Sequence, residues 1–314
     1  MPIRYETITN RGAPRGADPF VTRFGGVYYY CFSGRGGICV APCASLTDVR
    51  TAHERARCVW TPPAGTDYSR EIWAPELHRL GDSWYIYFAA DDGKNEHHRM
   101  YALTSSSEDP TEPFAFAGRV TAPTDKWAID GTVFSFRGVL YFVWSGWDGD
   151  VNVAQNLYIA RMSDPCTIST ERVCISRPEY AWETNSSPRV NEGPAALAGN
   201  DTVQLVYSAS GSWLDSYCLG CLTLSGGNPM DAAAWTKSPE PLLTQEPGTY
   251  GPGHCSFTTA PDGSTWMFYH ANETAGSGWG GRSLRMQPVD WDGRTLRTGR
   301  AALPDDALRV PVEG

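Results

Sequence analysis

The chain has 314 residues, of which 41% are hydrophobic and 19% are charged, and its formal net charge is −9. This length is enough to bury a full core, while an acidic chain without a Lys/Arg run is not expected to bind nucleic acid. No apolar stretch approaches the roughly 18 residues needed to span a bilayer, so no membrane partner is expected either. The 32 glycines and 23 prolines favour many tight turns over long helices.

The first residues, Met1–Glu6, contain no apolar segment of the kind found in signal peptides. We therefore expect a cytoplasmic protein if the chain is complete, and a secreted one if it is a processed mature form. The sequence leaves both localisations open.

Five short motifs recur along the chain, each followed by a turn and then by an aromatic-rich run with strand character. The motifs are Ala-Asp-Pro-Phe from Ala17, Ala-Pro-Glu-Leu from Ala74, Ile-Asp-Gly-Thr from Ile129, Asn-Glu-Gly-Pro from Asn191 and Pro-Gly-His-Cys from Pro252. The runs behind them are Val27–Phe32, Trp84–Ala89, Leu140–Trp144, Val203–Tyr207 and Trp266–His270. The polar residues at the centres of the motifs are Asp18, Glu76, Asp130, Glu192 and His254, which lie 54 to 62 positions apart. A period of about that length, with several short strands in each repeat, is typical of β-propeller blades.

The second repeat shows the expected strands most clearly, at Glu76–Leu80, Trp84–Ala90, Arg99–Ser105 and Phe114–Val120. In the third repeat the expected strands are Thr132–Phe136, Leu140–Ser145, Leu157–Met162 and Val173–Ser176. Alternating apolar and polar positions, separated by Gly, Asp and Asn, indicate strands joined by hairpins. We predict an all-β fold, a single five-bladed β-propeller domain with blades at about residues 17–60, 73–120, 129–176, 191–243 and 252–300. The first strand of each blade lines the axis of a propeller, so the five polar residues are expected to converge at one end of it.

Four carboxylates and a histidine in one ring suggest a chemical purpose. Cleavage of a glycosidic bond needs one carboxylic acid to protonate the departing oxygen and one carboxylate on the opposite side of the sugar. A third carboxylate nearby would raise the pKa of the acid, since like charges resist joint ionisation. The alternative is that each acidic residue only shapes a turn, because Asp before Pro or Gly is a common turn former. That alternative is favoured for a single motif, but placement at the same point of five repeats favours a site.

The segment Asp91–His98 holds two patterns that could bind a metal, Asp91-Asp-Gly93 and Glu96-His97-His98. The first lacks the downstream glutamate of a calcium loop, so we interpret it as a turn. We interpret the second as a solvated loop that could rim the pocket. Cys218 and Cys221 lie in a predicted strand, Tyr217–Leu224, where residues three apart face opposite sides, so they are expected to be core thiols.

The five motifs resemble those of glycoside hydrolase family 43, from about Ala17 to Gly299. The matching segments are Arg15-Gly-Ala-Asp-Pro-Phe-Val, Ile72-Trp-Ala-Pro-Glu-Leu-His, Trp127-Ala-Ile-Asp-Gly-Thr-Val-Phe, Asn191-Glu-Gly-Pro and Tyr250-Gly-Pro-Gly-His. The resemblance implies a five-bladed β-propeller that hydrolyses arabinose- or xylose-containing polysaccharides with inversion and needs no cofactor for the chemistry.

Carried over position by position, the resemblance implies that Asp18 is the general base and Glu192 the general acid. Asp130 would raise the pKa of the acid and orient it. His254 matches an axial histidine that in many members holds a hydrated cation, often calcium, in the central channel. Glu76, the remaining ring carboxylate, is expected to be structural and to bond nearby backbone amides.

The resemblance also implies residues that contact the sugar. Trp73 and Arg282 fall where members of the family line the −1 subsite, and Trp147, in Trp144-Ser-Gly-Trp147, is a further candidate for that pocket.

Two departures from the family pattern bear on the substrate. Ala17 stands where many endo-acting arabinanases have histidine, and Cys255 stands where asparagine often follows the axial histidine. The stretch after Gly299 has no room for the C-terminal β-sandwich common in family β-xylosidases. These features favour an exo-acting α-L-arabinofuranosidase acting as a monomer on an arabinose-containing oligo- or polysaccharide. The alternatives are a β-xylosidase or galactanase on the same fold, or a propeller that binds sugar without cleaving it.

Overall fold

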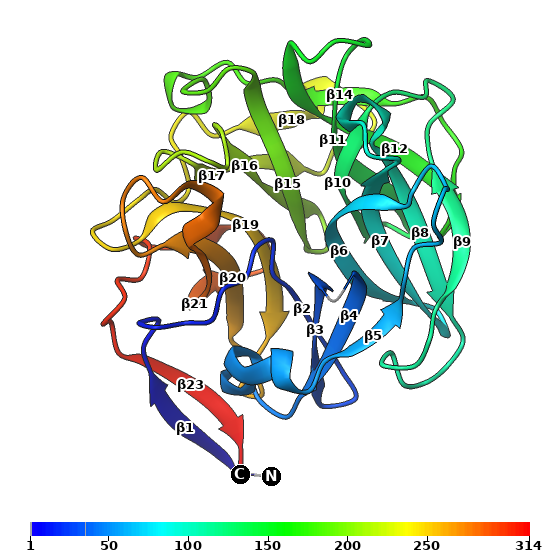
Figure 1. Ribbon diagram of the computed structural model, residues 1–314. Coiled ribbons are helices and arrows are strands. Elements are labelled where there is room, and N and C mark those ends of the chain that lie inside the picture. Colours follow the sequence, from blue (N-terminus) through cyan, green and yellow to red (C-terminus); the bar gives the residue numbers. More distant parts are fainter. Residues whose placement is uncertain (1, 35) are drawn as a thin grey trace.

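The computed structural model describes residues 2–34 and 36–314, and strands dominate this part of the chain (Figure 1). The predicted all-β class is therefore confirmed. The helical segments in the described residues are short 3-10 turns, of which η1 (Thr47–Glu54) is the longest. None of the helices described is long and apolar enough to cross a membrane.

Three of the sheets are four-stranded antiparallel meanders in sequence order. The first contains β2 (Phe20–Phe24), β3 (Val27–Gly34), β4 (Gly37–Cys43) and β5 (Arg57–Trp60). The second contains β6 (Arg70–Leu80), β7 (Ser83–Asp91), β8 (Arg99–Ser105) and β9 (Ala115–Val120). The third contains β19 (Tyr250–Thr259), β20 (Thr265–Asn272), β21 (Arg282–Trp291) and β22 (Leu296–Arg297).

A nine-stranded sheet lies between the second and third of these meanders in the sequence. Its first half contains β10 (Ala128–Phe136), β11 (Val139–Gly146), β12 (Ala154–Asp164), β13 (Thr167–Ile168) and β14 (Val173–Ser176). Its second half contains β15 (Arg189–Ala198), β16 (Thr202–Ala209), β17 (Cys218–Ser225) and β18 (Trp235–Lys237). Both halves are antiparallel, and a short parallel pairing of β12 with β15 joins them.

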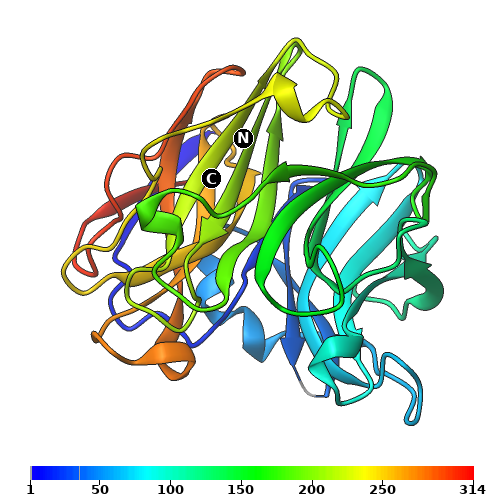
Figure 2. The same ribbon diagram turned by 90° about the horizontal axis from the view of Figure 1, so that it is seen from above.

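The innermost strands surround a common centre. β2 contacts β6, β6 contacts β10, β10 contacts β15, β15 contacts β19, and β19 contacts β2. Figure 1 shows these strands around the middle of the molecule, and Figure 2 shows the cyan sheet and the orange-red strands on opposite sides of the green ones. The residues that begin these strands are thereby brought to one place.

Hydrophobic clusters between successive sheets form the core. Trp60, Trp84 and Phe88 belong to the cluster between the first sheet and the second. Tyr30 and Trp266 belong to another cluster, in which the last of the four-stranded sheets packs on the first. The three four-stranded sheets and the nine-stranded sheet therefore pack against neighbours on both faces, and the aromatic runs identified in the sequence are strands of these sheets. Cys218 and Cys221 lie in hydrophobic clusters on opposite faces of β17, so both are buried core thiols, as predicted.

Candidate active site

Four of the five predicted ring residues sit at irregular points near the start of an inner strand. The backbone φ angles of Asp18, Asp130 and His254 are +49°, +56° and +49°, and Glu192 is followed by Gly193 at +54°. Positive φ is uncommon for residues other than glycine, and such strain is concentrated at functional sites. The pairing of β10, β15 and β19 with the next strand also shifts register here, as at a β-bulge, which can re-aim a side chain.

These side chains meet in a cavity of about 540 Å³. Its wall contains predicted site residues, namely Asp18, Trp73, Asp130, Glu192, His254 and Arg282. It also contains Asn95, from the loop within Asp91–His98 that is expected to rim the pocket. Sequence reasoning missed the other wall residues, namely Glu71, Trp127, Ile129, Asn152, Gln155, Pro188, Ser212, Trp213 and Trp279.

His254 lies between two of the carboxylates. Its Nδ1 is 3.3 Å from Asp18 Oδ1 and 3.8 Å from Asp130 Oδ2. Burial opposes a positive charge on this ring, but Asp18, Asp130 and Glu192 together raise the pKa of His254 above its ordinary value. The backbone amide of His254 donates to Ser208 Oγ at 2.7 Å, which fixes the strand beneath the ring.

Asp18 and Glu192 have pKa values displaced in opposite directions. Burial alone would raise the pKa of Asp18, but His254, His270 and Arg282 hold it well below its usual range. Burial and the nearby charge of Asp130 raise the pKa of Glu192 to about 8. At neutral pH one carboxyl is therefore ionised and the other protonated, which is the pairing that acid–base catalysis requires.

The pKa of Asp130 lies between those of Asp18 and Glu192. Burial raises its pKa to about 6, although His254 and the backbone amide of Gly193 favour the charged form. That amide donates to Asp130 Oδ2 at 3.0 Å, so Asp130 is held directly against the residue that follows Glu192. Glycine suits this position, because its φ is +54° and a Cβ on Gly193 would crowd the His254 ring at 3.1 Å.

Tyr217 and His270 support the reacting groups from behind. The Tyr217 hydroxyl donates to Glu192 Oε1 at 2.9 Å, and its ring stacks on His270 at 5.7 Å between centroids. The amide of Asp18 donates to His270 Nδ1 at 3.2 Å, and burial lowers the pKa of His270 to about 4, so the imidazole is neutral. Neither residue belongs to a repeated motif, which is why the sequence pattern did not single them out.

Arg282 and Trp73 line the cavity as expected. Arg282 Nη1 lies 3.4 Å from Asp18 Oδ1. Trp73 stacks on His98 with 4.0 Å between ring centroids. His98 is fully buried, with Nδ1 3.1 Å from Asp91 Oδ2. The interpretation of His98 as a solvated loop residue is therefore wrong, because the loop folds back behind Trp73.

Trp147 is not among the described residues that line the cavity. It is buried, and its ring stacks behind Trp127 with 4.7 Å between centroids. Trp127 forms the wall in its place. Its position could have been noticed in the sequence, because Trp127 precedes Asp130 by three residues as Trp73 precedes Glu76.

Glu76 is buried, and its Oε2 lies 2.8 Å from His78 Nε2. Among the described residues, the partner of Glu76 is thus an imidazole on the same strand and not the expected backbone amides. Glu76 is not among the described residues on the cavity wall.

The metal prediction rests on His254. Among the described residues, no three His, Cys, Asp or Glu side chains are grouped closely enough to hold an ion between them. A channel ion would therefore take one imidazole nitrogen from His254 and its remaining ligands from water, and the role of His254 as a metal ligand stays a prediction.

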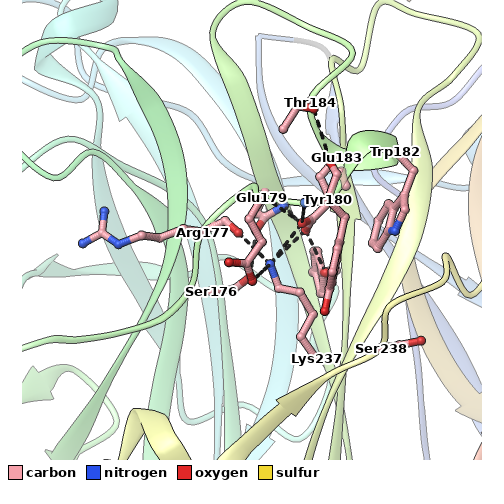
Figure 3. Close-up of polar contacts among 12 residues, drawn as sticks. Ser176, Arg177, Glu179, Tyr180, Trp182, Glu183, Thr184, Lys237 and Ser238 are labelled. Carbon is pink, nitrogen blue, oxygen red and sulfur yellow. Dashed lines mark hydrogen bonds and ion pairs between the residues drawn. The ribbon is translucent and has the colours of Figure 1, made fainter.

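A buried ion pair supports the strand that carries Glu192 (Figure 3). Asn191 Nδ2 donates to Glu183 Oε1 at 2.9 Å, and the Lys237 ammonium donates to both oxygens of Glu183 at 3.1 Å. The backbone amides of Glu179 and Tyr180 donate to Glu183 Oε2. Because a buried charge is costly without partners, this network fixes the start of β15.

The cavity thus holds a partly exposed carboxyl, Asp18, and a buried one, Glu192, whose pKa values are displaced in opposite directions. Such a pair is the means by which glycoside hydrolases cleave their substrates. The comparisons with known proteins agree with that class. The family model described as glycosyl hydrolases family 43 matches residues 12–295. The chain belongs to this family.

Several relatives are similar over most of the chain. A Streptomyces chartreusis protein named extracellular exo-α-(1→5)-L-arabinofuranosidase is 36% identical over 266 residues, covering 82% of this chain and 80% of that protein. A Streptomyces avermitilis protein of the same name is 36% identical over 274 residues, covering 84% of this chain but 56% of the relative. The crystal structure of an α-L-arabinofuranosidase from Lactobacillus brevis has a TM-score of 0.85 at 32% identity, covering 95% of this chain and 97% of that one.

Proposed function

We propose that this chain is an exo-acting, inverting α-L-arabinofuranosidase that releases terminal L-arabinofuranose from α-1,5-linked arabinan or arabino-oligosaccharides. The observation that carries the catalytic part is the opposed displacement of the pKa values of Asp18 and Glu192. The substrate is inferred from the names of the relatives, which are arabinofuranosidases.

In this mechanism Asp18 is the general base and Glu192 the general acid. Asp18 accepts a proton from a water molecule whose oxygen attacks the anomeric carbon, while Glu192 gives its proton to the departing glycosidic oxygen. Burial and the negative charge of Asp130 keep Glu192 protonated. The two carboxyls and one water molecule supply every proton and oxygen atom that the hydrolysis needs, so no cofactor takes part.

Trp73 and Arg282 are proposed to bind the terminal sugar in the −1 subsite, with Trp127 as a further wall residue in place of Trp147. Apolar ring faces suit the carbon face of a furanose, and Arg282 can donate to its hydroxyls while it holds Asp18. We further propose that His254 holds a hydrated cation, with calcium as the expected ion, below this subsite.

We also propose that the antiparallel meanders are the blades of one five-bladed propeller domain, with the blade bounds expected from the sequence. The ring of contacts among β2, β6, β10, β15 and β19 supports this. The nine-stranded sheet then consists of two neighbouring blades, which are joined by the short parallel pairing of β12 with β15. The chain is expected to act as a monomer.

The test compares hydrolysis of 4-nitrophenyl α-L-arabinofuranoside, 4-nitrophenyl β-D-xyloside and linear arabinan by the same protein. We expect the arabinofuranoside to be the best substrate and arabinan to yield arabinose from the first time points. Proton NMR of the fresh hydrolysate should show the anomer opposite to that of the substrate. Preference for the xyloside would refute the proposed substrate, and initial retention of configuration would refute the inverting mechanism. Sugar binding without cleavage would mean that the protein is a carbohydrate-binding propeller and not an enzyme.

A further inference from the structure

Two tryptophans at the mouth of the cavity are unusually exposed for their size. Trp213 is 37% exposed and Trp279 is 58% exposed, although large aromatic side chains are mostly buried elsewhere in the chain. Both line the cavity, together with Ser212. Neither belongs to a repeated motif, and the mechanism proposed above uses neither of them.

The two tryptophans come from different loops that are tied together. Trp213 lies in the loop between β16 and β17, and Trp279 lies in η5 (Gly278–Gly281), between β20 and β21. Their rings meet edge to face at 5.8 Å, and Trp279 Nε1 donates to Ser212 Oγ at 3.0 Å. The amide of Gly276 donates to both carboxylate oxygens of Asp215 at 2.9 Å. The pair is thus held in place by contacts that leave much of its apolar surface uncovered.

The position of this pair indicates which part of a substrate it would meet. Glu192 is paired in register with Ser208 on β16, and the loop that carries Trp213 follows the end of that strand. Pro188, just before β15, also lines the cavity. A general acid must lie beside the departing oxygen, so the loop next to Glu192 borders the leaving group and not the sugar that is released.

We infer that Trp213 and Trp279 form a platform for the pentofuranosyl residue of the leaving group, and that they raise kcat/KM for oligosaccharides relative to glycosides whose leaving group is too small to reach them. The inference rests on the proposed function, because it takes Glu192 as the acid. Exposed, pre-oriented indole faces stack on the apolar face of a sugar without the cost of ordering a mobile loop.

The test measures kcat/KM for α-1,5-arabinotriose and for methyl α-L-arabinofuranoside, whose leaving group is too small to reach a platform. Trp279→Ala and Trp213→Ala should each lower kcat/KM for arabinotriose by about tenfold, the worth of one buried apolar sugar face, and should change the value for the methyl glycoside much less. Trp279→Phe should recover part of the loss. Gly211→Ala offers an independent route, because its Cβ would lie 2.7 Å from the Trp213 ring and displace it.

Phe24→Ala is the matched control. Phe24 is an aromatic residue 43% exposed at the β2–β3 turn, and it is not among the described residues that line the cavity. It should leave the ratio of the two kcat/KM values unchanged. Equal losses on both substrates in the tryptophan variants, or no loss on arabinotriose, would overturn the platform while the proposed function stands. If the unsubstituted protein cleaves neither substrate, the proposed function fails, and the platform assignment with it.

Discussion

At the scale of single residues, the site shows how neighbours give different chemistry to similar groups. Asp18 and Glu192 are both carboxyls on the wall of one cavity. Asp18 faces Arg282 and two imidazoles, whereas Glu192 faces Asp130 and a neutral phenol. Burial favours the protonated form of both groups, but His254 and Arg282 favour a carboxylate at Asp18, whereas the negative charge of Asp130 adds to the effect of burial at Glu192. The different roles of the two carboxyls therefore depend on the surroundings that the fold supplies.

We expect Asp18→Asn and Glu192→Gln each to lower kcat on arabino-oligosaccharides by on the order of 10²–10⁴, the usual contribution of a positioned acid or base. Glu192→Gln should retain more activity on an aryl glycoside whose leaving group needs no proton. Circular dichroism should show that both variants keep the fold. Near wild-type turnover in either variant would remove that residue from its assigned role.

The alkaline limb of the pH–activity profile should report the pKa of Glu192. Activity requires Glu192 to be protonated, so kcat/KM should fall as the pH rises through about 8. Asp130→Asn removes a negative neighbour and should move this limb to lower pH. Tyr217→Phe removes a hydrogen bond that favours the ionised form and should move it to higher pH. Shifts of the same sign in both variants would contradict the assignment of the limb to Glu192.

At the scale of elements, the sequence predicted where strands lie better than where they begin. β8 and β14 match the expected Arg99–Ser105 and Val173–Ser176. β10 begins four residues before its expected start at Thr132, because the bulge at Asp130 interrupts the pairing without ending the strand. The Asp-Gly pair that favours a turn serves here as that irregularity. Trp213 and Trp279 could not be predicted either, because loops distant in the sequence bring them together.

One bulge gives a test of close packing. A Cβ on Gly253 would lie 2.2 Å from the Tyr217 ring, so Gly253→Ala should displace Tyr217 and lower the free energy of unfolding by about 1–3 kcal/mol. It should also reduce kcat, because Tyr217 contacts Glu192. Gly149→Ala is the control, since a Cβ there meets nothing within 4 Å. Denaturant unfolding of the two variants measures the difference in the free energy of unfolding. Equal stabilities would mean that the Tyr217 ring moves aside without a loss of stability.

At the scale of the whole molecule, the two ends of the described chain join outside the ring of inner strands. β1 (Ile3–Ile8) pairs antiparallel with β23 (Leu308–Glu313), as Figure 1 shows. Leu308 and Val310 of β23 belong to the cluster in which the last sheet packs on the first. The sequence repeats gave no sign of this pairing, because neither strand contains a motif. The pair adds a contact across the point where the ring closes.

Val310 tests how much this closing contact contributes. Its side chain is fully buried against the first and last sheets, so Val310→Ala leaves a cavity and should lower the free energy of unfolding by about 2 kcal/mol. Arg309→Ala is the control on the same strand, because Arg309 is exposed and lies 4.6 Å from the Tyr5 ring. Catalysis should change little in either variant, since neither residue is among those on the cavity wall. Thermal unfolding and kcat measured together would show a loss of stability separated from activity. A large loss of kcat in Val310→Ala at a temperature where the protein is folded would instead mean that closure of the ring shapes the site itself.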